Sequence, residues 1–250
     1  MLEGMRRARL LLPLLLGLLA PAQAADLPLP YRYGFSPDGR YHLLLTAWTR
    51  DGSGLAAAGL RVVRQGVGVV LEDELTDAPA PTAETPSKAP EQLAEELLAR
   101  HAEELHRLGL DAAPIPGRVL WAEAPARPQA GWPAPGAQRV ELPKDAQSSV
   151  NVAELRPVAS RNTCPTADML PSEPLGLRLR VNGQDWFRDT IDLPAGRACI
   201  AAYRLETIWQ YGDNIAVLLR GYEPGFEGPD ARPITLLNRV PSVPAAVEGK

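Results

Sequence analysis

Residues 175–191 read LGLRLRVNGQDWFRDTI, and this stretch decides the fold class. Leucine or valine at positions 175, 177, 179 and 181 alternates with glycine or arginine, which gives a strand with one apolar and one largely cationic face. Asn182-Gly183 is the strongest short hairpin signal in the chain, because both residues tolerate the positive φ of a two-residue turn. The segment from Trp186 to Ile191 is the expected returning strand. The stretch therefore predicts an antiparallel hairpin.

Other apolar runs extend this pattern along the chain. A tight turn at Pro37-Asp38-Gly39 leads into an apolar, β-prone run. Gln65-Gly66 separates two short runs in the manner of a hairpin. The expected strands are residues 41–48, 60–64, 67–71, 175–181, 186–191, 199–211, 215–222 and 233–240. We therefore predict a mainly β fold of antiparallel sheets, arranged as a sandwich or as two packed sheets.

One amphipathic helix interrupts the strands. From Pro90 to Leu108, apolar residues recur at helical spacing, with Pro90 suited to the first turn and Gly109 to the end. Prolines crowd residues 79–90, an expected linker, and residues 114–143, expected to be irregular chain over the core or a mobile excursion. We place this proline-rich and helical insertion at about residues 78–145.

Composition excludes several classes of protein. The 250 residues carry a formal net charge of −4, which argues against a nucleic-acid binder that neutralises phosphates. Apolar residues make up 45% of the chain, too many for wholesale disorder, and they fall in short bursts, unlike those of a polytopic membrane protein.

The first 24 residues have the arrangement of a signal peptide. A cationic region around Arg6 and Arg7 precedes the apolar stretch from Leu10 to Leu19, and Ala22-Gln23-Ala24 is an A-x-A cleavage pattern. The apolar stretch is too short for a permanent membrane span. We predict a signal peptide over 1–24, one β-rich exported domain over 25–240 with no transmembrane anchor, and a frayed tail over 241–250.

Export determines how the two cysteines are interpreted. An oxidising compartment favours a disulfide between Cys164 and Cys199. Closing this loop would stabilise the fold by roughly 4 kcal/mol. The alternative, a catalytic thiol, requires a nearby histidine, and no histidine lies close in sequence.

Three motifs could carry chemistry. HAEELH at 101–106 resembles a zinc-protease motif, but its histidines are five residues apart and point in different directions on a helix, so we expect no metal site there. Asp51-Gly52-Ser53-Gly54 suits a plain turn, or a catalytic Ser53 with His42. The loop at 225–230, GFEGPD, suits a structural cap on a sheet. It also suits a calcium or ligand site built from Glu223, Glu227 and Asp230, or a hydrolytic carboxylate pair.

The segment 34–41, the Asp51-Gly52-Ser53-Gly54 loop and the 225–230 loop followed by Arg232 together resemble a family of predicted secreted bacterial proteins of unknown function. The likeness spans about residues 31–240. It implies export and a shared fold, and it supplies no activity.

We therefore expect an exported cell-envelope protein, in the periplasm or outside the cell, that acts as a non-catalytic binding or interaction module. Its expected partner is an envelope component or a small ligand, with no nucleic acid and no cofactor. The candidate ligand-binding residues are Asp51, Ser53, Glu223, Glu227 and Asp230. The alternatives are an exported hydrolase that uses Asp51, Glu227 and Asp230, or a calcium-stabilised β-module.

Overall fold

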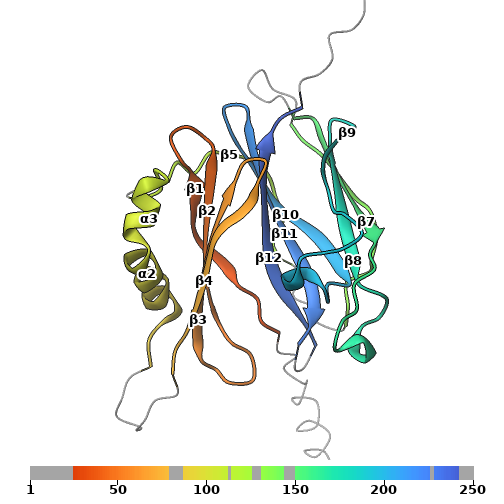
Figure 1. Ribbon diagram of the computed structural model, residues 1–250, viewed down its shortest axis with the longest axis horizontal. Coiled ribbons are helices and arrows are strands. Elements are labelled where there is room, and N and C mark those ends of the chain that lie inside the picture. The colour runs from red at the N-terminus through yellow and green to blue at the C-terminus, as the bar shows by residue number, and fades with distance from the viewer. Residues whose placement is uncertain are drawn as a thin grey trace, which may run out of the picture.

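The computed structural model describes residues 25–78, 87–111, 114–125, 131–143, 150–225 and 228–241. Three antiparallel sheets of four strands each lie face to face, and two helices cover the outer face of the first sheet (Figure 1). The mainly β, antiparallel fold expected from the sequence is confirmed. The packed sheets number three rather than two, because both faces of the central sheet are buried against a neighbouring sheet.

The first sheet has the order β1-β2-β3-β4. Its strands are β1 (Leu29–Phe35), β2 (Tyr41–Thr49), β3 (Ala56–Arg64) and β4 (Gly68–Thr76). The predicted turn before β2 is present: Gly39 has a φ of 68°, and the Ser36 hydroxyl donates to the Asp38 carboxylate at 2.6 Å. The hairpin around Gln65-Gly66 is also present, although both of its strands extend further than expected.

Two helices pack against β2, β3 and β4. They are α2 (Pro90–Arg100) and α3 (Ala102–Arg107), and both turn buried leucines toward the sheet, among them Leu93, Leu97 and Leu105. The single helix expected from Pro90 to Leu108 is therefore wrong in one respect, since it breaks at His101. There φ is −103° and ψ is 14°, and the ring Nε2 lies 2.8 Å from the Asp73 carboxylate on β4.

The second sheet is the central layer and has the order β12-β11-β10-β5. Its strands are β5 (Arg118–Ala122), β10 (Ala202–Tyr211), β11 (Asn214–Pro224) and β12 (Pro229–Arg239). Both faces of β11 are buried: Ile215 and Val217 pack toward the third sheet, whereas Ala216 and Leu218 pack toward the first. This double burial explains why β11 is a continuous apolar run in the sequence.

The third sheet contains the hairpin predicted over residues 175–191, although its second strand covers 184–188 and not the expected 186–191. Its strands, in the order β6-β7-β8-β9, are β6 (Gln138–Glu141), β7 (Val152–Ala159), β8 (Leu175–Val181) and β9 (Gln184–Arg188). Asn182 and Gly183 both have positive φ, as the predicted turn requires, with values of 51° and 80°. Leu177, Leu179 and Val181 are buried against the central sheet.

Two 3-10 turns flank the predicted disulfide, η1 (Ala167–Met169) and η2 (Ala195–Arg197). Cys164 and Cys199 are joined, with their Cα atoms 4.9 Å apart. The bond ties the chain before β8 to the turn that leads into β10.

The expectation of irregular chain over 114–143 is wrong in part. Residues 118–122 form β5 at an edge of the central sheet, and residues 138–141 form β6 at an edge of the third sheet. Prolines flank these strands without interrupting them, which is where edge strands accommodate proline. The predicted signal peptide, most of the 79–90 linker and all but the first residue of the expected 241–250 tail lie outside the described residues.

Candidate functional site

A pocket of about 170 Å³ lies between the first sheet and the β11–β12 hairpin. We call it the inter-sheet pocket. Three parts of the chain form its wall: the N-terminal segment at Asp26 and Pro28, strands β2 to β4, and the β11–β12 hairpin near its turn. The pocket thus depends on contacts between residues that are far apart in the sequence.

The walls combine apolar surface with cations. Leu44 and Trp48 supply apolar surface from β2. Arg61 pairs with Glu72 on the neighbouring strand β4, and its side chain is 15% exposed. Burial lowers the pKa of Arg61, and the like charge of Arg232 contributes to the same shift. These two guanidinium groups therefore act on the same region of the pocket.

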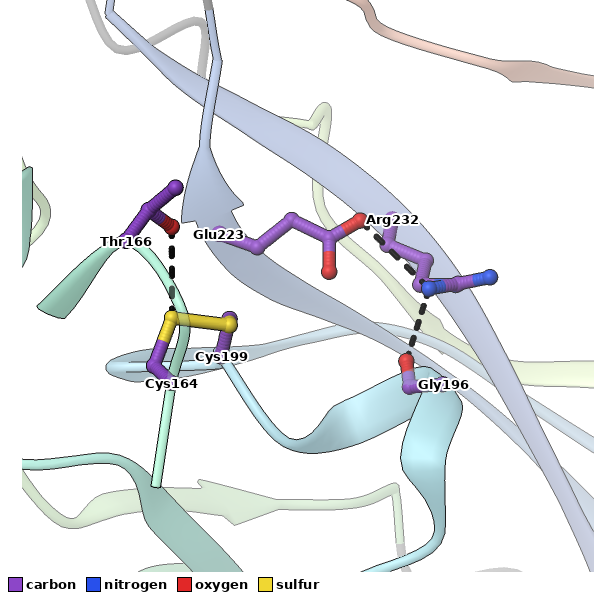
Figure 2. Close-up of a disulfide and its surroundings, with 6 residues drawn as sticks. All are labelled: Cys164, Thr166, Gly196, Cys199, Glu223 and Arg232. Atoms are coloured by element: carbon purple, nitrogen blue, oxygen red, sulfur yellow. Dashed lines mark hydrogen bonds and ion pairs between the residues drawn. A yellow bond between two sulfur atoms is a disulfide. The ribbon is translucent and has the colours of Figure 1, made fainter. Parts of the chain in front are cut away.

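The Arg232 side chain connects the pocket with the disulfide. Its Nη1 donates to the Gly196 carbonyl in η2 at 2.7 Å and lies 3.5 Å from Glu223 Oε1 (Figure 2). Gly196 precedes Cys199 by three residues, and the disulfide lies beside this network in Figure 2. The covalent link between the segments therefore fixes the turn that orients Arg232.

Two of the predicted site residues face each other across the hairpin. Glu223 on β11 pairs in register with Asp230 on β12, and both line the inter-sheet pocket. Burial raises the pKa of Glu223, although Arg232 opposes the shift. Burial also raises the pKa of Asp230, to about 6, and the nearby charges of Asp26, Glu223 and Asp51 act in the same direction. The pocket therefore holds two carboxyl groups that take up protons more readily than usual.

Asp26 joins the two predicted loops. Its backbone N–H donates to Asp230 Oδ1 at 2.9 Å, and its own Oδ1 accepts the Asp51 backbone N–H at 2.6 Å. Its Oδ2 accepts from Trp48 Nε1 at 3.3 Å and from Arg50 Nη1 at 3.2 Å. The structure thus brings the Asp51 loop and Asp230 together, although Asp51 does not line the pocket itself.

The other candidates fall elsewhere. The Asp51 carboxylate caps its own loop by accepting the Gly52 N–H at 2.7 Å. Ser53 is exposed, and its hydroxyl oxygen accepts the Leu55 N–H at 3.3 Å. His42 lies at the opposite end of β2, about 20 Å away at ~3.3 Å per residue, so a Ser53–His42 pair is not formed. Glu227 lies outside the described residues.

Sequence reasoning predicted only Glu223 and Asp230 of the pocket wall and missed the others, among them Asp26, Trp48 and Arg61. None of these three belongs to a recognisable motif, because each acts through partners at least ten residues away. In the part of the chain that the structure describes, no group of three His, Cys, Asp or Glu side chains is placed to hold a metal ion. A calcium site stays a prediction.

Residues 44–239 match the family model described as "Predicted secreted protein (DUF2259)". The chain belongs to this family. The match begins within β2 and runs to the end of β12, so it covers most of the pocket wall but not Asp26. No curated protein and no solved structure matches the chain.

The family description agrees with the export expected from the sequence. None of the described helices is long and apolar enough to cross a membrane.

Proposed function

We propose that the protein is an exported, non-catalytic binding protein that takes up a small polar molecule in the inter-sheet pocket. The observation that carries this proposal is the pocket itself, a cavity of about 170 Å³ where charged groups of both signs converge beside apolar side chains, as polar groups do in small-molecule sites. Trp48 offers apolar contact area, Arg61 and Arg232 offer donors, and Glu223 offers an acceptor.

The charges favour binding over nucleophilic catalysis. Each pocket arginine already has a carboxylate partner: Arg50 pairs with Asp26 and Glu74, Arg61 with Glu72, and Arg232 with Glu223. The described lining contains no serine, cysteine or histidine, and the hydroxyl of Thr46 donates to the Gly59 carbonyl at 3.3 Å. The lining holds six carboxylates and three arginines, so a ligand that carries both donors and acceptors would suit it.

The test is a thermal-shift screen in which the probes are free amino acids, monosaccharides and short aliphatic amines at millimolar concentration. A probe present at 100 times its Kd adds about 2.7 kcal/mol of stability. For a protein of this size that gain corresponds to a rise in Tm of roughly 5–10 °C.

Arg61→Gln should abolish this rise. Arg178→Gln should retain it, because Arg178 pairs with Asp185 on the third sheet, away from the pocket. A screen in which no probe raises Tm would overturn the proposal. An equal rise in Arg61→Gln and in the native sequence would also overturn it.

One observation favours a second candidate, an exported hydrolase. Glu223 and Asp230 face each other in the pocket with raised pKa values, and such carboxyl groups are suited to general acid catalysis near neutral pH. Hydrolysis of chromogenic glycosides by the native sequence, lost in Asp230→Asn, would support this candidate. Turnover that survives in Asp230→Asn would contradict it.

A further inference from the structure

The N-terminal segment is the least expected part of the pocket wall. Besides donating to Asp230, Asp26 accepts the Ala231 backbone N–H through its carbonyl oxygen at 2.9 Å. Together with the bond to Asp51, these contacts hold residue 26 between the loop after β2 and the start of β12. A segment that contacts both loops so closely contributes to the site as well as leading into β1.

Asp230 has an unbalanced charge. Its half-buried carboxylate lies near three other carboxylates, those of Asp26, Glu223 and Asp51. In the described part of the chain, no lysine or arginine forms an ion pair with it, although Asp26 and Glu223 each have an arginine partner. A positive charge placed beside Asp230 would therefore stabilise the folded protein.

The predicted cleavage would supply such a charge. The A-x-A pattern ends at Ala24, so cleavage there turns the Ala25 amide nitrogen into a free α-amino group. That nitrogen is one residue from the Asp26 nitrogen, which itself lies 2.9 Å from Asp230 Oδ1. Standard backbone dimensions then place it within about 6.5 Å of the carboxylate, and rotation about the Ala25 backbone can bring it closer.

We infer that removal of the leader after Ala24 completes the inter-sheet pocket, because the new α-ammonium group of Ala25 pairs with the carboxylate of Asp230. Hydrolysis of the Ala24–Ala25 peptide bond consumes one water and yields a carboxylate on the leader and an amine on the exported chain. At neutral pH this amine is largely protonated, since α-amino groups have pKa values near 8. The pair neutralises Asp230, the pocket carboxylate that has no lysine or arginine partner among the described residues, and fixes the N-terminal segment in place.

The inference is tested on two preparations of residues 25–250, one with a free α-amine and one with that amine acetylated. Urea unfolding at pH 7 should give an unfolding equilibrium constant about tenfold smaller for the free amine, the effect of a one-unit pKa change. An ion-paired amine has a raised pKa in the folded protein. Its contribution to folding stability is therefore complete below pH 8, near the pKa of the unfolded chain, and is lost as the pH rises through the higher pKa of the folded protein. The advantage should therefore disappear at strongly alkaline pH.

Asp230→Asn keeps the acceptor for the Asp26 N–H but removes the charge, so acetylation should then have no effect on stability. Asp192→Asn neutralises an exposed carboxylate outside the pocket and should leave the tenfold difference unchanged. Equal stability of the free and acetylated chains would overturn the inference, and so would an acetylation effect that persists in Asp230→Asn.

N-terminal sequencing of the exported protein should read Ala-Asp-Leu, and a different first residue would overturn the inference. None of these measurements requires a ligand. A pocket that binds no probe would therefore refute the proposed function and leave this result intact.

Discussion

The buried imidazole of His42 should make the protein sensitive to acid. The side chain is fully buried between the first and central sheets, with its ring centroid 4.8 Å from that of Phe35 and 5.3 Å from that of Trp209. Neither ring nitrogen has a hydrogen-bond partner among the described residues. Burial therefore lowers the pKa of His42 from 6.5 to about 3.

The size and sign of the effect follow from these two pKa values. Between pH 6.5 and pH 3 the unfolded chain binds a proton at His42 and the folded protein does not. Stability is thus complete above pH 6.5 and falls as the pH drops toward 3, by up to about 5 kcal/mol. Asp230 acts in the opposite direction between pH 3.8 and about 6, because its folded pKa is raised.

Comparison with His42→Leu isolates the histidine. Leucine has a similar volume and no titrating group, so the variant should be as stable as the native sequence at pH 8, or more stable, since two unpaired buried nitrogens are removed. Urea unfolding from pH 3.5 to pH 8 should show the variant gaining on the native sequence as pH falls, while effects of Asp230 cancel. His106→Gln, at a side chain that is 77% exposed, is the matched control. A difference between native and His42→Leu that does not change with pH would refute this reasoning.

Three further outcomes are expected in urea unfolding at pH 7. Glu206→Gln removes the carboxylate partner of the Arg220 guanidinium, which is 1% exposed, and should cost about 3–5 kcal/mol of stability. A loss as small as that caused by Glu103→Gln, at an exposed side chain, would contradict the stabilising role of this pair. Replacing both Cys164 and Cys199 by serine should cost about 4 kcal/mol through loop entropy, and unchanged stability would show that the bond does not form. Leu97→Ala leaves a cavity between α2 and the first sheet and should cost about 2–5 kcal/mol. A loss well below 2 kcal/mol would contradict the packing of α2 on this sheet.

Local patterns in the sequence predicted much of the fold. Alternation over 175–181 and the Asn182-Gly183 turn correctly located β8 and the turn into β9, because a half-buried strand must place its apolar residues on one face. The strands β1, β5, β6 and β7 are absent from the expected set. Of these, β5 and β6 have five residues or fewer and lie among prolines. Their pairing with β10 and β7 is a long-range contact that no local pattern reveals.

The candidate site could be predicted only in part. Glu223 and Asp230 were found because an unusual loop separates them in the sequence, and the hairpin register then brings them together. Asp26 and Arg61 could not be found, because their importance comes from partners on other strands: Asp26 contacts Asp230, and Arg61 lies near Arg232. A cavity between two sheets becomes visible only once the sheets are packed.

The most direct test of the binding role is a titration followed by backbone amide resonances in ¹H–¹⁵N NMR spectra of the ¹⁵N-labelled protein. The probe is the compound that gives the largest rise in Tm. If no compound raises Tm more than the others, amino acids, monosaccharides and aliphatic amines are titrated in turn. We predict saturable shifts at the amides of Arg61, Glu223 and Ala231, which line the inter-sheet pocket. Shifts that cluster instead at Val67 and Phe187, on a separate groove beside β9, or no saturable shift with any class, would contradict the account.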